Sequence, residues 1–189
     1  DIITKPAKKS PSPPFIPSTF QQEASRKLGF SVSQTMTVAQ RLYEAGHITS
    51  MRTDSVNLAQ SAVQAASAII TDIYGPEYAK TRSYKTKAKG AQEAHEAIRP
   101  TYLEKQNISG NNSEQKLYSL IWKRTVASQM SDAQLEKTTV KINNSNHEDD
   151  FVATGEVLKF EGFLKVYIES TDNDQEEEKK GLLPAMEIN

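Results

Sequence analysis

One short run of the sequence concentrates side chains that suit phosphate chemistry. It reads Ile48-Thr49-Ser50-Met51-Arg52-Thr53-Asp54-Ser55, so a hydroxyl, a guanidinium and a carboxylate lie within one short segment. A guanidinium stays charged and can donate to two phosphate oxygens, and an activated hydroxyl can attack a phosphorus centre. The same types also occur on inert surfaces, and Arg52 alone could equally be an ordinary surface charge.

Two further segments carry candidate ligand-binding side chains. Residues 94–100 read Ala-His-Glu-Ala-Ile-Arg-Pro, in which His95 could serve a site or could be a capped or core histidine. Residues 80–89 hold five cations around Tyr84 and no acid. Such a loop can follow a phosphate backbone and stack a base, but cationic runs are more often plain solvated surface. The cations are Lys80, Arg82, Lys85, Lys87 and Lys89.

Metal binding has little support in this sequence. No spacing of His, Asp and Glu resembles a metal site, and the chain has no cysteine. The acidic run 172–178 is expected to keep a loop soluble rather than to bind cations. We therefore predict no metal ligands within these residues.

Helices are expected to position the candidate residues. Ser18 predicts an N-cap, and Gly29 predicts the end of that first helix. Ser33 predicts the start of a second helix that ends at Gly46, with an apolar face of Met36, Ala39, Leu42 and Tyr43. The pair forms a helix-turn-helix-like unit. Residues 47–52 are too short for another helix, so a strand or extended segment is expected there.

The rest of the chain changes from helical to strand periodicity. Helices are predicted over about 58–74 and from Ser113, and strands over 138–142, 151–157 and 163–168. The predicted fold class is α+β, mainly α, with a helix-turn-helix-like helical domain followed by a partial antiparallel β region. The predicted domains are a linker at 1–14, which four prolines keep irregular, a helical domain at 15–136, and incomplete strands at 137–189.

Composition narrows the class of protein. The chain has 189 residues, with 37% hydrophobic and 25% charged residues and a formal net charge of −1. This balance argues against a uniformly basic nucleic-acid binder, so any DNA footprint must be local. The absence of cysteine and of a long apolar run favours a cytoplasmic protein without a membrane span. A start without methionine suggests a fragment.

The two motifs, with the segments around them, resemble bacterial type IA DNA topoisomerases. The resemblance is dense from Pro13 to Pro100, looser over 116–122, and extends to the strand region, which is similar to part of the family's hinge domain. Several multi-residue matches in the right order carry it. These are Pro14-Phe15-Ile16, Ser18-Thr19, Gln21–Ser25, Leu28-Gly29-Phe30 and Gln40–Gly46, followed by the two motifs quoted above.

The resemblance implies a reaction and a set of site residues. In this family a tyrosine attacks single-stranded DNA, forms a 5′-phosphotyrosine, lets a second strand pass and reseals the break without ATP. Negatively supercoiled DNA is thereby relaxed. Arg52 would bind the scissile phosphate, and Asp54 would orient His95 and favour its cationic form. Further DNA contacts are implied, at lower specificity, for Thr53, Gln40, Glu44, Lys85, Lys87 and Lys89.

Position 50 departs from the family, because a serine stands where the family has its tyrosine nucleophile. A serine hydroxyl reaches less far than a phenol and is much less acidic than tyrosine, whose pKa is about 10. A misplacement of about 1 Å can cost about a hundredfold in rate, so we predict no cleavage. One rival is that Ser50 itself attacks. Tyr43 is an unsuitable substitute, because the helix pattern places it on the apolar face.

The resemblance also implies what lies outside these residues. The family's Toprim domain, which binds Mg²⁺, has no counterpart here, so no cofactor is expected in this segment. Expected partners are single-stranded DNA and the remaining domains of the same enzyme, with no membrane, a monomeric state and a nucleoid-associated location. Two alternatives stay open: a non-catalytic module that binds single-stranded DNA, and a structural piece that is inert until it docks.

Overall fold

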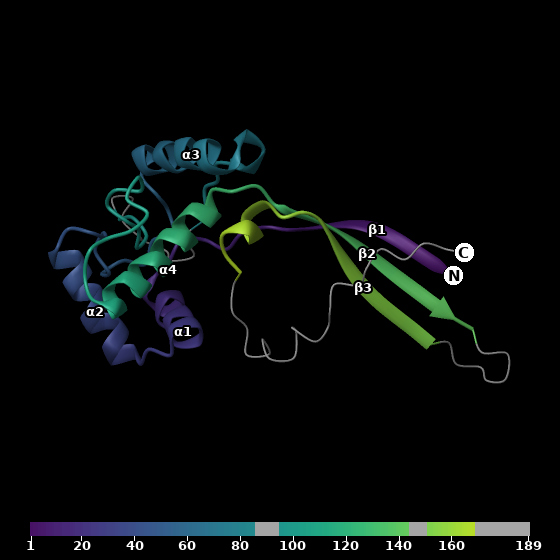
Figure 1. Cartoon of the computed structure of the whole chain (residues 1–189), viewed down its shortest axis with the longest axis horizontal. Coiled ribbons are helices and arrows are strands. Elements are labelled where there is room, and N and C mark those ends of the chain that lie inside the picture. The colour runs from purple at the N-terminus through teal and green to yellow at the C-terminus, as the bar shows by residue number, and fades with distance from the viewer. Residues whose placement is uncertain (86–94, 144–150, 169–189) are drawn as a thin grey trace. The chain divides into compact units, whose positions relative to one another are not determined.

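The structure is a computed structural model that describes residues 1–85, 95–143 and 151–168. These residues divide into two compact units. One comprises residues 1–10, 132–143 and 151–162, and the other comprises 11–85, 95–131 and 163–168. The first is a β-sheet and the second is helical, which confirms the α+β prediction (Figure 1).

The sheet unit contains three antiparallel strands. They are β1 (Ile2–Lys9), β2 (Ala133–Ile142) and β3 (Phe151–Phe160), in the order β1-β2-β3. Exposed ion pairs cross the strands, with Lys9 and Lys137 each facing Glu156 at 3.8 and 3.6 Å. Such exposed ion pairs contribute little stability. The backbone hydrogen bonds that β2 forms with β1 and β3 are therefore the main interactions that hold this sheet together.

Strand β1 corrects the prediction that residues 1–14 form a linker. Ile2–Lys9 pair with β2 over their whole length, including Pro6 opposite Glu136. Proline lacks an N–H donor and is tolerated where that group would face away from the neighbouring strand, which is possible at an edge. The prolines of this segment do exclude a helix and a central strand, but an edge strand tolerates Pro6.

The helical unit contains four α-helices. They are α1 (Pro17–Leu28), α2 (Val32–Glu44), α3 (Gln60–Tyr74) and α4 (Asn112–Ser128). The described residues also form two short 3₁₀ turns, η1 (Pro76–Tyr78) and η2 (Gly162–Lys165). The third predicted strand, 163–168, is wrong, because η2 begins that segment and the rest of it has no strand pairing.

Helix starts differ from the sequence prediction by one or two residues. Helix α1 begins at Pro17 with Ile16 as N-cap, whose N–H donates to the Thr19 hydroxyl. Proline is favoured in this first position because its missing N–H would have no partner there. Ser31, rather than Ser33, caps α2 by accepting from the Gln34 N–H at 3.1 Å. The predicted end at Gly29 is confirmed, with a φ of 67°.

The apolar face of the second helix differs from the prediction. Helix α2 buries Thr35, Val38, Ala39 and Leu42, whereas Tyr43 is 44% exposed. The prediction that Tyr43 lies on the apolar face is therefore wrong, because residue type alone does not show which face meets a packing partner. Helix α3 buries Ala62, Ala66 and Ile70 and leaves Ile73 49% exposed.

Helix α4 is the centre of the helical unit. Its residues 117, 118, 120–122 and 124–128 are buried, and it contacts α1, α2 and α3. The indole N–H of Trp122 donates to the Leu103 carbonyl at 2.8 Å. A helix that is buried almost all round requires partners on every side, so the other segments of this unit are organised around α4.

A buried charged cluster fixes residues 163–168 to α1 and α4. The Tyr167 hydroxyl donates to the Glu23 carboxylate, and Arg124 lies with its guanidinium carbon 5.3 Å from the Tyr167 ring centroid. Arg124 also donates to the Pro13 carbonyl at 2.6 Å. Burial is the main cause that raises the pKa of Tyr167, followed by its bond to Glu23. Tyr167 therefore remains a neutral donor.

No described helix is long and apolar enough to cross a membrane.

We expect truncation of Ile121 to destabilise the helical unit strongly, because its side chain is fully buried in α4. Ile121→Ala should lower the free energy of unfolding by about 2–5 kcal/mol, and Ile121→Val by about 1 kcal/mol. Urea denaturation followed by fluorescence of Trp122, the one tryptophan in the chain, measures both. Ile73→Ala, at an exposed helical site, is the control. An Ile121→Ala change as small as the control's would contradict the assignment of α4 as the core.

Candidate functional site

The segment that carries Ser50 is held by backbone pairing to the second motif. The Thr49 N–H donates to the Arg99 carbonyl and the Thr101 N–H donates to the His47 carbonyl, both at 2.9 Å. The Thr49 hydroxyl donates to the Ala97 carbonyl at 2.9 Å and accepts from the Arg99 N–H at 3.0 Å. The two motifs, distant in the sequence, are therefore paired through their backbones. This pairing agrees with the prediction that residues 47–52 are extended.

The same element reaches the start of the helical unit. Ile98 pairs with Phe15, its N–H donating to the Phe15 carbonyl at 2.9 Å, and the Ala97 N–H donates to Asn57 at 2.8 Å. Phe15, Ala97 and Ile98 are fully buried. Buried backbone groups with partners on both sides resist local opening, so the segment bearing Ser50 is held rigidly at its base.

Hydroxyl side chains shape the backbone from Ser50 onward. Ser50 accepts from the Arg52 N–H at 3.1 Å, and Thr53 accepts from the Ser55 N–H at 3.1 Å. Ser55 then accepts from the Asn57 N–H at 3.2 Å. Each is a local turn in which a side-chain oxygen replaces a backbone acceptor. The Ser50 oxygen consequently lies against its own main chain.

The predicted ligand-binding side chains mostly face solvent. Arg52, Asp54 and His95 are exposed, and Ser50 and Thr53 are half-buried. Among the contacts of the described residues, no hydrogen bond or ion pair joins Asp54 to His95. The implied orientation of His95 by Asp54 is therefore not present in this structure, and both roles stay predictions.

The remaining predicted contacts are placed as follows. Gln40 and Glu44 are exposed one turn apart on α2, with the Gln40 amide donating to the Glu44 carboxylate at 2.8 Å. Lys85 is exposed, while Lys87 and Lys89 lie outside the described residues. Tyr84 is anchored, since its hydroxyl lies 3.1 Å from the carbonyl oxygens of Pro11 and Ser128.

Glu96 is a structural residue of the site that the sequence analysis did not assign. It forms two contacts with Arg99, one of them at 3.0 Å, and the backbone N–H of Ala59, the N-cap residue of α3, also lowers the pKa of its carboxyl group. The hydrogen bond from Arg99 is the main cause that lowers the pKa of Glu96, opposed by partial burial. A carboxylate at a helix N-terminus is favourable. The second motif thus places a carboxylate near the start of α3.

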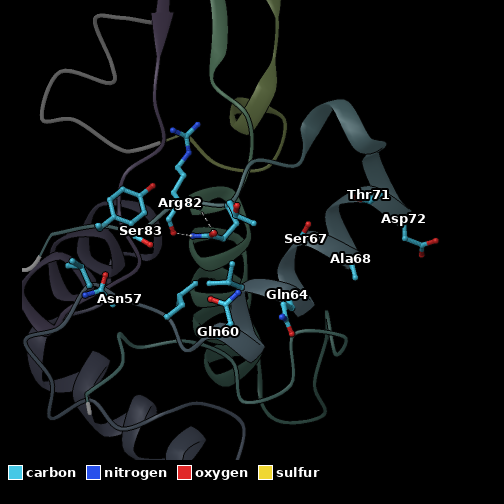
Figure 2. A pocket seen from close by; sticks show the side chains of 15 residues that line it. Asn57, Gln60, Gln64, Ser67, Ala68, Thr71, Asp72, Arg82 and Ser83 are labelled. Atoms are coloured by element: carbon cyan, nitrogen blue, oxygen red, sulfur yellow. Dashed lines mark hydrogen bonds between the residues drawn. The ribbon is translucent and has the colours of Figure 1, made fainter. Parts of the chain in front are cut away.

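The residues that follow Ser55 line a cleft between α3 and residues 81–84 (Figure 2). Its volume is about 860 Å³. Gln60, Gln64 and Ser67 face it from α3. On the other side Arg82 is fixed, donating to the Met130 carbonyl at 3.0 Å through its guanidinium and to the Gln129 side chain at 2.9 Å through its backbone N–H. Arg82 therefore holds this wall together.

Within residues 1–85, 95–143 and 151–168, no group of three or more His, Asp or Glu side chains could hold a metal ion. The described residues therefore do not fit Mg²⁺.

Comparisons with known proteins identify the family of this site. A family model described as "DNA topoisomerase" matches residues 1–189. The chain belongs to the type IA DNA topoisomerase family. The prediction made from the two motifs is confirmed at this level, and the roles of individual residues are left as predictions.

Curated relatives and a solved structure agree with this assignment. The chain is 49% identical over 176 residues to DNA topoisomerase 1 of Zymomonas mobilis, covering 92% of this chain and 14% of that protein. It is 50% identical over 180 residues to DNA topoisomerase 1 of Mycobacterium tuberculosis, covering 89% of this chain and 19% of that protein. Full-length topoisomerase I from Thermotoga maritima matches with a TM-score of 0.77 and 37% identity, covering 91% of this chain and 29% of that one.

We expect the Glu96–Arg99 pair to make stability depend on acid pH. Because the folded-state pKa of Glu96 is below its ordinary value of 4.5, its contribution is complete above about pH 4.5 and is lost as pH falls toward the lowered pKa. Glu96→Gln should be less stable than the parent at pH 7, and the difference should shrink as the pH falls below about 4.5. Thermal unfolding across this range measures it. Glu161→Gln, at an exposed carboxylate, is the control, and an undiminished difference at low pH would contradict the pairing.

Proposed function

We propose that this chain is the strand-cleavage region of a type IA DNA topoisomerase and holds single-stranded DNA along the Ser50 segment without cutting it. The intact family enzyme would relax negatively supercoiled DNA through a transient break, with the remaining domains as partners. The chain spans 14% and 19% of two of the curated relatives it matches, so the activity of a whole enzyme is part of this proposal.

The observation that carries the proposal is the rigid base of the Ser50 segment beneath exposed polar side chains. The Thr49 hydroxyl is hydrogen-bonded to the backbone of Ala97 and Arg99 in the second motif. Arg52 and His95, on the two paired segments, are exposed to solvent. An arginine on a fixed backbone presents a phosphate-binding fork with little loss of entropy on binding. This arrangement supports DNA binding by Arg52 with help from His95.

The chemistry of Ser50 supports loss of cleavage. In the family reaction the nucleophile's oxygen forms a bond to phosphorus, its proton leaves, and the 3′ oxygen of the DNA departs as the leaving group. Ser50 is half-buried, and its oxygen accepts from the Arg52 N–H. A short side chain held against its own backbone cannot occupy the place of a phenol oxygen several bonds further out.

In this proposal, Mg²⁺ would be bound by residues outside the described part of this chain. In the family it would supply electrostatic stabilisation of phosphate charge. Here Arg52 would neutralise phosphate charge, and the imidazole of His95 would add a second donor.

The decisive experiment restores the nucleophile. A chimaera of the Mycobacterium tuberculosis enzyme, in which this chain replaces the matching segment, would be assayed with Mg²⁺ as the Ser50 form and as Ser50→Tyr. We expect a covalent protein–oligonucleotide adduct and plasmid relaxation only with Ser50→Tyr, because only the phenol has the reach and acidity required.

Two further variants control this experiment. Ser50→Phe adds the ring without the hydroxyl and should form no adduct, which separates packing from chemistry. An adduct in the Ser50 form that disappears in Ser50→Ala would instead show that Ser50 attacks. Inactivity of Ser50→Tyr in a folded chimaera that still binds DNA would favour the binding-module alternative.

Binding to DNA is tested on the 189-residue chain itself. Arg52→Ala should weaken binding to a single-stranded oligonucleotide by about fourfold at 0.15 M salt and reduce the salt slope by about 0.7, as expected for one lost phosphate contact. Fluorescence anisotropy in a salt titration measures both. Arg26→Ala, at an exposed arginine at the end of α1, is the control. An equal loss in both variants, or in neither, would contradict the role of Arg52.

A further inference from the structure

A second groove of the helical unit lies between α1, α4 and the segment that follows η2. Its volume is about 420 Å³, and its lining includes Lys27 from α1, Lys116 and Lys123 from α4, and Ile168. None of the described lining residues is acidic. The formal net charge of the chain is −1, so this concentration of positive charge is local.

Beyond the first turn of α4, the wall that it contributes to the groove is its one solvent-facing stripe. Lys116, Ser119 and Lys123 follow at spacings of three and four residues, which places them on one face. Lys116 and Lys123 are exposed, and neither forms a hydrogen bond or ion pair with a described residue. At a rise of 1.5 Å per residue, their backbone positions lie about 10 Å apart along the helix.

The opposite wall holds its cation in a fixed place. The Lys27 ammonium donates to the Ile168 carbonyl and lies 4.7 Å from the Tyr167 ring centroid. Tyr167 is itself fixed by its bond to Glu23. Lys27 is therefore partly preorganised, whereas the two lysines of α4 keep their full hydrogen-bonding capacity for a ligand.

We propose that this groove binds the phosphate backbone of DNA and is a binding site separate in sequence from the Ser50 segment. Three cations without an acid match a chain of phosphates, and Ser119, between Lys116 and Lys123, adds a neutral donor. The proposal rests on the proposed function only in naming DNA as the polyanion. The groove reads no bases, because its aromatic residue, Tyr167, is only 5% exposed and its ring is covered by Lys27.

The test is a double variant of the 189-residue chain, Lys116→Gln/Lys123→Gln. Loss of two phosphate contacts should weaken binding of a fluorescein-labelled single-stranded oligonucleotide by about tenfold at 0.15 M salt and reduce the salt slope by about 1.4. An abasic oligonucleotide of the same length should show the same loss, since only phosphates are contacted. Lys5→Gln/Lys141→Gln removes equal charge from exposed positions of β1 and β2 and is the matched control.

Each outcome decides between the two sites. A loss in the groove variant well beyond that of the control supports the groove, whether or not Arg52→Ala also weakens binding. A loss only in Arg52→Ala overturns the groove and leaves the proposed function standing. A loss only in the groove variant keeps the groove and removes the role proposed for Arg52. Equal losses in groove and control variants, or a loss that vanishes with the abasic strand, overturn the groove.

Discussion

The site depends on the hydrogen bonds of Thr49. Its backbone N–H and its hydroxyl together engage the Ala97 and Arg99 main chain, so one residue fastens two motifs that are remote in sequence. Without that fastening, Ser50 and Arg52 would belong to a loop, and His95 would belong to another. A β-branched residue suits this place because its stiff side chain holds the hydroxyl in one direction.

The arginines in this structure fall into two groups, those that cross-link the interior and those that are exposed. Arg82, Arg99 and Arg124 direct their donors inward to carbonyl and carboxylate groups, where a planar fork satisfies several acceptors at once. They join loops to α4, to Glu96 and to the start of the helical unit. Arg52 differs because it is exposed, as Arg26 and Arg41 also are. The arginines at the surface of the described residues are therefore distinct from the three that cross-link the interior.

Features of the fold that depend on neighbouring residues could be predicted from the sequence. The helix end at Gly29 and the extended segment before Arg52 were both predictable, because a left-handed turn and a short interval between helices need no distant partner. What failed depends on distant contacts. Ile16, the residue before Pro17, is the N-cap of α1 in place of Ser18, and Glu96 and the start of α3 belong to segments that only the fold brings together. The resemblance supplied the family, which periodicity alone could not.

Pro6 has a consequence for the behaviour of the chain in solution. Among the described strands, β1 lies at an edge of the sheet, and its outer side is a row of backbone groups that could template another strand. The apolar side chains of Ile2 and Ile3 are 49% and 44% exposed beside it. Proline removes one donor from that edge, and Lys5 and Lys8 flank it with charge. A second copy of the chain that paired with this edge would lack one hydrogen bond at Pro6 and would be repelled by the lysine charges beside it. The residue that made β1 hard to recognise thus protects it against self-assembly into aggregates.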